Sequence, residues 1–365
     1  MVKTMNRITA ALFCLFIMGF GLLHLVLPDR DFSELENRNL AQLPEFSWQA
    51  LVDGSYTADL EEYLADQFPL RDSWMTLKTG YEYLLGQREF NGVYLAEDTL
   101  ISKLTDTSRA DKNLGYMQTL VDKSEVPVYL GLIPTAAALW QDKLPQGAEN
   151  FDQFDYLESA KGIGANWVDM AGALGEHANE QIYYRTDHHW TSPGAYYGYT
   201  ALMEAMGLEA LPLGEKVTVS DSFNGTLYSS SGIHWLESDA IDRYVSGEGV
   251  TVENGQTGEM GGLYVDSFLD RKDQYSSFMG GNNPLYIVRN DRAATDRKLL
   301  VVRDSYSDSL APFLSQSFSE VHLLDLRYYK TSVAEYAAQM GADAIFVCYS
   351  VENFVKDTDA VFLGY

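Results

Sequence analysis

The sequence predicts an α/β protein with a three-layer architecture, in which a parallel sheet carries helices on both faces. Short apolar runs at residues 126–133, 298–302 and 344–349 alternate with helical patterns along the chain. Continuous apolar runs of this length are typical of strands that are buried on both sides. Strands that alternate with helices usually form a parallel sheet covered by those helices. We therefore predict one large α/β domain at residues 105–365.

Residues 8–27 form an almost wholly apolar segment ahead of this domain. As a helix, about 20 residues reach across about 30 Å, the thickness of a bilayer's hydrocarbon core. Lys3 and Arg7 precede the segment and acidic residues follow it, which orients the N-terminus inside and the rest of the chain outside the cytoplasm. Because no small-residue cleavage site follows, we predict an uncleaved signal anchor at residues 1–28, which spans the cell membrane once. The alternative is a cleaved signal peptide and a secreted protein.

Residues 29–104 are predicted to form a tether, two helices and a hairpin. Apolar residues at helical spacing lie in 51–64 and again in 74–85, and a proline breaks the pattern between them. Two short apolar segments on either side of an acidic turn at residues 93–101 are typical of a hairpin.

Residues 211–297 interrupt the alternation of strands and helices. This segment is rich in Ser, Gly, Asn and Thr and contains short β-like pieces. We predict an insertion of loops and strands on the rim of the α/β domain, where it would form one wall of a site. Asn224 and Asn282 stand in its turn sequences, and each is either a plain turn residue or a donor to an oxyanion.

The segment 186–191, with the sequence T-D-H-H-W-T, holds the densest cluster of functional residue types in the chain. A helical pattern begins directly behind it, with Ser192 at the expected N-cap and Pro193 at the first helical position, and continues to Gly207. The positive end of the helix dipole disfavours an imidazolium, which helps to keep a histidine neutral as a general base must be.

Backbone geometry predicts how the side chains of this segment divide. If residues 183–191 are extended, Asp187 and His189 point to one side and His188 points to the other. An acid on the same side as a histidine is suited to orient a catalytic base, although Asp187 could equally cap local N–H groups at the helix entry. Adjacent histidines that diverge are poor joint metal ligands, so we predict no metal, while the residue types leave a metal site as a second alternative.

Ser305 is the candidate nucleophile. The apolar run 298–302 ends just before it, and a helical pattern through Phe318 follows. A serine at the carboxyl end of a strand that turns into a helix presents its hydroxyl at the sheet edge, where α/β folds build sites. Backbone N–H groups at such a turn can hold an oxyanion, although serines at these turns are also common helix caps.

These motifs resemble a known family. The T-D-H-H-W stretch followed by T-S-P-G-A-Y-Y resembles the bacterial DHHW proteins. Its pairing with the later D-S-Y-S at 304–307 resembles the SGNH-hydrolase-like domain of the alginate O-acetyltransferases of the AlgX and AlgJ type. Further matching pieces are E-N-R at 36–38, D-Q-F-P-L-R at 66–71, N-G-V-Y at 91–94 and G-G-N at 280–282. The resemblance covers nearly the whole chain from about residue 33.

The resemblance implies an SGNH-like fold and a permuted triad order in which Asp187 and His189 precede Ser305. It implies that Ser305 is the nucleophile, that His189 is the general base and acid, and that Asp187 orients His189. In the alginate enzymes a small neutral residue and Thr precede the serine, whereas this chain has Arg303 and Asp304. The sequence leaves open whether the Asp304 carboxylate pairs with Arg303 or points away from Ser305. Candidates for contact with the substrate or the oxyanion are Arg303, Tyr306, His188, Trp190, Asn282 and Asn224.

The activity implied by the resemblance is O-acetylation of a cell-surface or secreted polysaccharide through an acetyl-serine intermediate. The implied partners are a polysaccharide acceptor and a membrane-bound O-acyltransferase that supplies acetyl groups. No cofactor is expected. The same triad would also serve a carbohydrate esterase, that is a deacetylase, and the fold without activity would serve a carbohydrate-binding scaffold.

Composition excludes other classes of function. The formal net charge is -26, which repels a phosphate backbone, so we expect no nucleic-acid partner. The 2 cysteines cannot build a disulfide framework. The sequence contains no G-x-G-x-x-G or P-loop motif, so a nucleotide-binding function has no support.

Overall fold

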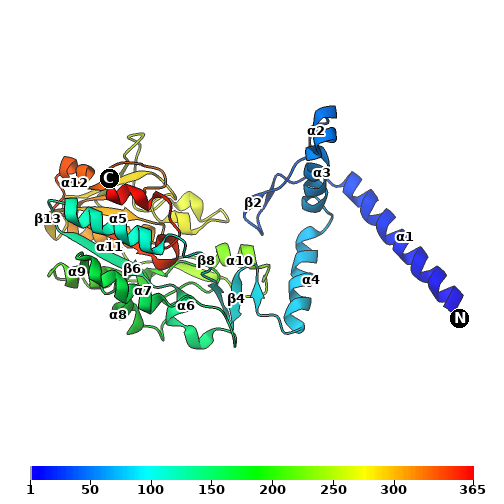
Figure 1. Cartoon of the computed structure of the whole chain (residues 1–365), viewed down its shortest axis with the longest axis horizontal. Helices are drawn as coiled ribbons and strands as arrows, with labels where there is room; N and C mark the ends of the chain where they lie inside the picture. Colours follow the sequence, from blue (N-terminus) through cyan, green and yellow to red (C-terminus); the bar gives the residue numbers. More distant parts are fainter. Residues whose placement is uncertain (1) are drawn as a thin grey trace. The chain divides into compact units, whose positions relative to one another are not determined.

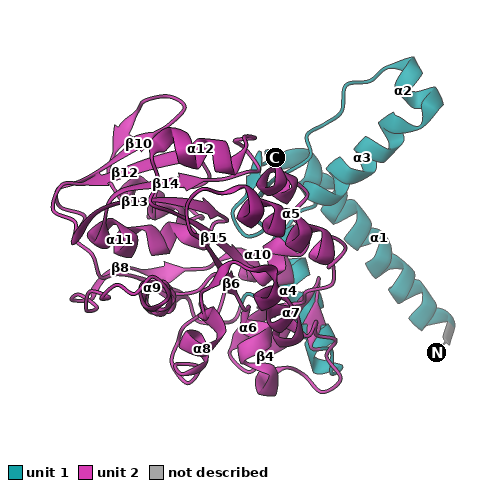
Figure 2. Cartoon of the chain, turned by 60° about the vertical axis from the view of Figure 1, so that its left-hand side comes forward, with its two compact units in different colours: residues 1–87, 232–234 teal, residues 88–231, 235–365 magenta. Residues whose placement is uncertain are grey.

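The computed structural model describes residues 2–365, which divide into two compact units (Figure 2). One unit comprises the chain up to Gln87 together with Gly232–His234. The other comprises Arg88–Ser231 and Trp235–Tyr365. The division into 1–28, 29–104 and 105–365 that the sequence indicates stays a prediction. The first unit is called the N-terminal unit below, and the second the α/β unit.

Helices dominate the N-terminal unit, and all of them are labelled in Figure 1. The first, α1, is Val2–Val26, and its part Lys3–Val26 is long and apolar enough to cross a membrane. The predicted break at Pro69 is present, since one helix ends at Asp66 and the next begins at Arg71. The remaining elements are β1 (Phe32–Ser33), β2 (Arg38–Asn39), α2 (Trp48–Asp53), α3 (Ser55–Asp66) and α4 (Arg71–Leu84).

An 8-stranded sheet forms the centre of the α/β unit, in the order β11-β10-β12-β14-β13-β15-β6-β7. The five strands from β14 to β7 run parallel to one another. Their bounds are β6 (Val128–Ile133), β7 (Asn166–Trp167), β13 (Thr295–Arg303), β14 (Phe318–Leu324) and β15 (Ala344–Ser350). The predicted runs at 126–133, 298–302 and 344–349 therefore lie on β6, β13 and β15.

The other edge of the sheet is antiparallel, which corrects the prediction of a purely parallel sheet. Its strands are β10 (Val250–Asn254), β11 (Met260–Gly261) and β12 (Leu285–Asn290), and all three come from the segment 211–297. Strand β12 pairs with β14, so part of this segment extends the central sheet. The alternation of strands and helices could not predict this edge, because antiparallel strands need no helix between them.

The two faces of β13 bury alternate residues under different helices. Leu299 and Val301 pack on the side of α9 (Ser192–Ala205) and α11 (Ser307–Ser317), whereas Leu300 and Val302 belong to the core on the other face. That second core includes residues of α5 (Ala110–Lys123), α7 (Gln153–Ala160) and α12 (Val333–Met340). Apolar side chains on both faces of the strand explain its continuous apolar sequence, and they produce the three layers.

Smaller elements complete the α/β unit. The predicted hairpin is present as β4 and β5, which pair antiparallel. A third strand, β3, pairs antiparallel with β4. The helix expected behind the D-H-H-W segment is α9, and its N-cap is Thr191 rather than Ser192, because the Thr191 side chain accepts from Gly194 N–H. The bounds are β3 (Glu89–Phe90), β4 (Val93–Ala96), β5 (Thr99–Ser102), α6 (Ala136–Leu139), α8 (Met170–Gly175), β8 (Val217–Phe223), α10 (Thr226–Ser231), β9 (Asp239–Arg243) and α13 (Val351–Phe354).

Candidate active site

Ser305 lies in the short turn between β13, which ends at Arg303, and α11, which begins at Ser307. The turn is closed by Asp308 N–H, which donates to the backbone oxygen of Ser305 over 3.2 Å. Strand β13 has parallel neighbours on both sides, so its carboxyl end is a central position on the sheet edge where α/β proteins build sites. Within the described residues, no hydrogen bond uses the Ser305 amide N–H. The turn therefore offers both a hydroxyl and a free backbone donor.

The D-H-H-W segment forms a bent loop, which corrects the expectation of an extended backbone. Tyr183 and Trp190 form an isolated antiparallel bridge, and the residues between them turn back on themselves. The Asp187 carboxylate accepts a hydrogen bond from the His189 backbone N–H over 2.9 Å, which stabilises the bend locally. As a result the rings of His188 and His189 lie side by side, with centroids 3.9 Å apart, instead of diverging.

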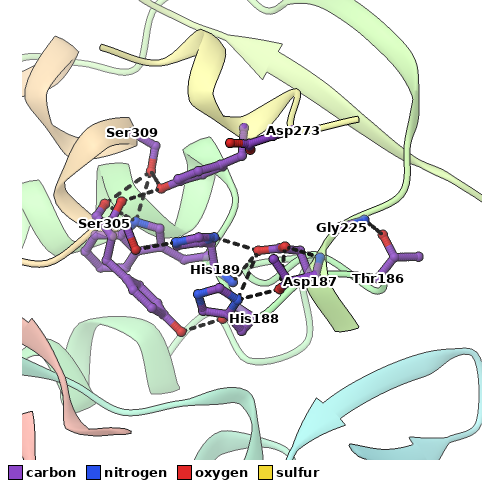
Figure 3. Close-up of polar contacts among 12 residues, drawn as sticks. Thr186, Asp187, His188, His189, Gly225, Asp273, Ser305 and Ser309 are labelled. Carbon is purple, nitrogen blue, oxygen red and sulfur yellow. Dashed lines mark hydrogen bonds and ion pairs between the residues drawn. The ribbon is translucent and has the colours of Figure 1, made fainter. Parts of the chain in front are cut away.

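Three side chains form a continuous chain of hydrogen bonds (Figure 3). The Nδ1 atom of His189 lies 2.6 Å from Asp187 Oδ1, and its Nε2 atom lies 2.7 Å from Ser305 Oγ. Asp187 and His189 are buried, while Ser305 is partly exposed. This geometry, with an acid, an imidazole and a hydroxyl in series, is that of a nucleophile activated by an oriented base.

The carboxylate of Asp187 is held by more than the histidine. Its Oδ2 atom accepts from the backbone N–H of Thr226 over 2.7 Å and from the Thr226 hydroxyl over 2.9 Å. Burial by itself raises the pKa of Asp187, but the nearby His188 and His189 and these hydrogen bonds outweigh it, so the pKa lies well below its usual range. Asp187 is therefore ionised and fixed in orientation.

The segments that carry His189 and Ser305 are joined directly to each other. The indole Nε1 of Trp190 donates to the backbone oxygen of Tyr306 over 2.9 Å, and the Tyr306 hydroxyl donates to the backbone oxygen of His188. These two bonds run in opposite directions between the same two loops and hold His189 and Ser305 in register. Trp190 and Tyr306 are almost fully buried, so both act as structural supports of the site.

Tyr275 is a further support of the site that the sequence did not indicate. Its ring lies on the ring of His189, and its hydroxyl donates to the backbone oxygen of Ser305 over 3.1 Å. Thr226 was missed as well, although it follows the N-G turn of residues 224–225, which was the one available signal. No sequence signal pointed to Tyr275, because its role depends on how the segment 211–297 folds back onto the sheet.

Arg303 and Asp304, the charged residues that precede Ser305, each have partners other than one another. Asp304 Oδ2 accepts from the backbone N–H and hydroxyl of Ser350 and from the Asn353 amide, all over 2.8 or 2.9 Å, at the start of α13. Arg303 is fully buried and pairs with Asp308 over 2.6 Å. The Asp304 carboxylate thus joins β13 to the end of β15 through Oδ2, and its Oδ1 accepts from the backbone N–H of Tyr306 over 3.0 Å within the Ser305 turn.

The other candidate contact residues are dispersed. Arg303, Trp190 and Tyr306 use their side-chain donors inside the protein, so the structure does not bring these donors to a substrate. The side chain of His188 is 28% exposed, and its Nδ1 lies 2.7 Å from the Thr226 hydroxyl. Asn224 Oδ1 accepts from Ser238, and Asn282 Oδ1 accepts from Arg327. Of the six candidates, His188 is the side chain adjacent to the triad that is open to solvent.

Asp187, His188 and His189 also have the composition of a metal site. Their ligand atoms all lie within 4.8 Å of one another, so the premise that the histidines diverge was wrong. However, both ring nitrogens of His189 already take part in the chain that links Asp187 to Ser305. A metal ion bound by His189 would replace one of these two hydrogen bonds, which makes the metal and the triad competing uses of the same atoms.

Two of the solved structures compared with this chain share its fold, and a third is less similar. A solved DHHW family protein from Eubacterium siraeum is 25% identical, with a TM-score of 0.65, over 75% of this chain and 95% of that chain. Bacillus cereus PatB1, solved with a sulfonyl adduct, is 19% identical with a TM-score of 0.59, over 74% and 97% of the two chains. The O-acetyltransferase domain of Pseudomonas putida AlgJ is 16% identical with a TM-score of 0.47, over 73% and 93%. No curated protein matches the chain.

The family pattern described as "DHHW protein" matches residues 118–324, which contain the D-H-H-W segment, the segment 211–297 and the Ser305 turn. The match covers more than half of the 365 residues. The chain therefore belongs to the DHHW protein family.

Proposed function

We propose that this protein is a serine-dependent acyltransferase that works outside the cytoplasm and O-acetylates a cell-surface or secreted polysaccharide. The observation that carries the proposal is the chain of hydrogen bonds from Asp187 through His189 to Ser305. The resemblance of both triad segments to the alginate O-acetyltransferases supports the choice of acetyl groups and of a polysaccharide acceptor.

In the first half of the reaction Ser305 accepts the acetyl group. Its Oγ attacks the carbonyl carbon of an acetyl ester, while the Oγ proton moves to His189 Nε2. Asp187 holds the Nδ1–H of His189 and stabilises the imidazolium that forms. The carbonyl oxygen becomes an oxyanion, for which the free amide N–H of Ser305 is a suitable donor. The C–O bond to the leaving alcohol then breaks, and His189 returns the proton to that alcohol.

In the second half the acetyl group leaves Ser305 for the acceptor. His189 removes the proton of a sugar hydroxyl, whose oxygen attacks the acetyl-serine carbonyl carbon. The bond to Ser305 Oγ breaks, and the proton from His189 restores the serine hydroxyl. With water in place of the sugar the same steps give an esterase, so the choice between transfer and hydrolysis lies in acceptor binding.

The proposed location follows from α1. A helix of this length and composition fits a signal anchor or a signal peptide. As an anchor it would keep the α/β unit outside the cell at the membrane, where a membrane-bound O-acyltransferase can supply acetyl groups. A cleaved helix would release the same activity as a secreted protein.

Trapping of the acyl-enzyme tests the proposal. The protein and its Ser305→Ala variant are incubated with an activated acetyl ester, and intact mass is measured; transfer of one acetyl group adds about 42 Da. An adduct on the parent that is absent from the variant supports the nucleophile, and peptide mapping should find it at Ser305. Addition of oligosaccharides then separates transfer, which yields acetylated sugar, from hydrolysis, which yields acetate. A folded parent that forms neither adduct nor product contradicts the enzyme and favours the scaffold.

A further inference from the structure

Helix α4 of the N-terminal unit carries a stripe of large apolar side chains on its solvent side. The stripe residues within α4 follow one another at steps of three and four positions, which places them along one face of the helix, and Leu70 precedes them as the N-cap residue. Leu77 is 62% exposed and Leu84 is 82% exposed, the reverse of what a helix on a soluble surface shows. The stripe consists of Leu70, Trp74, Leu77, Tyr81 and Leu84.

A groove runs beside the stripe within the same unit. Its volume is about 740 Å³, and the residues that form it include Leu35, Thr76, Leu77, Gly80, Tyr81 and Leu84. Contiguous exposed apolar surface of this kind marks an interaction site, because leaving it in water costs free energy. The question is which apolar environment covers it.

Contacts between α1 and the start of α4 point to the lipid bilayer as that environment. The ring of Phe20 stacks on the ring of Phe68, with centroids 5.4 Å apart and an interplanar angle of 2°. Trp74 lies 5.8 Å from Phe20 and 6.3 Å from Phe16 between ring centroids. Nearer the end of α1, His24 Nδ1 lies 3.2 Å from the backbone oxygen of Gln67. The chain from Gln67 to Trp74 thus follows α1 inward from its outer end.

The position of these contacts along α1 sets their depth in a bilayer. At a rise of 1.5 Å per residue, Phe20 lies about 9 Å and Phe16 about 15 Å from the Val26 end of the helix. A hydrocarbon core is about 30 Å thick, so Phe16 of a membrane-spanning α1 lies near the bilayer midplane. Trp74 of α4, which contacts both rings, would then lie in the outer leaflet. The other stripe residues of α4 lie on the same face of α4 as Trp74.

The polar side chains of α4 fit this arrangement. Asp72 forms an ion pair with Arg30 over 2.8 Å, and Lys78 forms one with Glu82 over 3.0 Å, so these four charges are neutralised in pairs. Paired and long charged side chains at the borders of an apolar face suit the headgroup region of a bilayer, as do the Trp and Tyr of the stripe.

We propose that α4 is a second membrane-contacting element, which inserts its stripe into the outer leaflet beside α1. The proposal rests on the membrane-anchored location given above. Lipid acyl chains fill the groove and cover Leu77, Tyr81 and Leu84. The N-terminal unit is then held on the bilayer by a transmembrane helix and by an interfacial one.

Depth-dependent fluorescence quenching tests this arrangement in the full-length chain. Cys14 in α1 is exposed and is replaced by Ser, while Cys348 is buried and stays unlabelled. Single cysteines are introduced as Leu77→Cys and Leu84→Cys on the stripe and as Asp59→Cys, an exposed position on α3, for comparison. Each variant is labelled with an environment-sensitive dye and reconstituted in phosphatidylcholine vesicles. Nitroxide groups on the lipid acyl chains quench dyes in the bilayer, and aqueous iodide quenches dyes in water.

The lipid-covered stripe predicts that nitroxide lipids quench positions 77 and 84 several-fold more strongly than position 59, with the opposite order for iodide. A protein that floats with the vesicles but shows iodide quenching at 77 and 84 equal to that at 59 overturns the proposal. Shielding of 77 and 84 from both quenchers also overturns it, because a second copy would then cover the stripe. Failure to float with vesicles at all is a separate result that refutes the anchor itself, and acetyl transfer to Ser305 is independent of each of these outcomes.

Discussion

The ring of Tyr275 lies flat on the ring of His189, with centroids 3.9 Å apart and an interplanar angle of 9°. The same tyrosine donates its hydroxyl to the backbone oxygen of Ser305. One buried side chain therefore fixes the plane of the proposed base and the position of the proposed nucleophile, although it comes from the inserted segment rather than from the central strands.

Tyr275 is expected to act as a positioning residue. Tyr275→Phe keeps the stack and loses the hydrogen bonds of the hydroxyl with the backbone oxygen of Ser305 and with Ser309 Oγ. Each has a net contribution of about 1 kcal/mol, so we expect kcat to decrease by about five- to thirtyfold. Tyr275→Ala loses the stack as well and should lower kcat much further, while KM changes little because the ring is buried. Steady-state kinetics of acetyl transfer check this. Equal losses in the two variants, or a change confined to KM, would contradict a role through His189.

Gly225→Ala is expected to disturb the triad directly. A Cβ atom added at Gly225 would lie 2.3 Å from the Cβ and Oδ2 atoms of Asp187, so the carboxylate has to shift. Overpacking of this kind costs about 1–3 kcal/mol of stability. We expect a lower melting temperature and a large loss of acetyl-serine formation. The matched control is Gly115→Ala on α5, where the added Cβ meets nothing within 4 Å, and which should leave both properties intact.

The buried pair of Arg303 and Asp308 is expected to show strong coupling. Burial raises the pKa of Asp308 to about 7 even beside Arg303, so removal of the arginine, as in Arg303→Met, leaves a buried carboxyl that must take up a proton and lacks its partner. This should lower the free energy of unfolding by about 3 kcal/mol. The double variant with Asp308→Leu removes both charges and should be more stable than Arg303→Met alone. Urea unfolding of the four proteins in the cycle measures the coupling. Additive losses would show that the pair is not coupled in the folded state.

The stability contribution of Asp187 is expected to depend on pH. Its folded-state pKa lies below the unfolded-state value, so the contribution is complete above the unfolded-state pKa and is lost as the pH falls toward the folded-state pKa. The stability advantage of the parent over Asp187→Asn should therefore decrease below about pH 4, where free aspartates titrate. Unfolding midpoints measured from neutral to acid pH check this, with exposed Asp59→Asn as the control. A difference that stays constant throughout this range would be the contrary result.

Chelators are expected to leave the acyl transfer unchanged. His189 uses both ring nitrogens in the path from Asp187 to Ser305, so the reaction needs no metal there. An excess of Zn²⁺ should inhibit instead, because the clustered ligand atoms of Asp187, His188 and His189 can bind it at the expense of the triad. Activity assays with a chelator and with added zinc check both expectations. Loss of activity with the chelator and recovery with metal would favour the metal site.

Features of this structure that depend on local sequence patterns could be predicted, whereas contacts between segments far apart in the chain could not. Strands β6, β13 and β15 were predictable because burial on both faces requires continuous apolar runs. The sequence pattern predicted Asp187 and His189 on one side of an extended backbone, but their loop bends, because the Asp187 side chain accepts from the His189 backbone N–H. The contact of Tyr275 with His189 depends on packing between distant segments, and no local pattern encodes such a contact.

The 116 residues that separate His189 from Ser305 along the chain have a consequence for folding. The loop between them must close before the imidazole can reach the hydroxyl. Contacts of such high sequence separation form slowly. If Ser305 is the nucleophile, as proposed, its reactivity depends on the finished fold, and a nascent or partly unfolded chain would carry an ordinary alcohol that does not capture acyl groups.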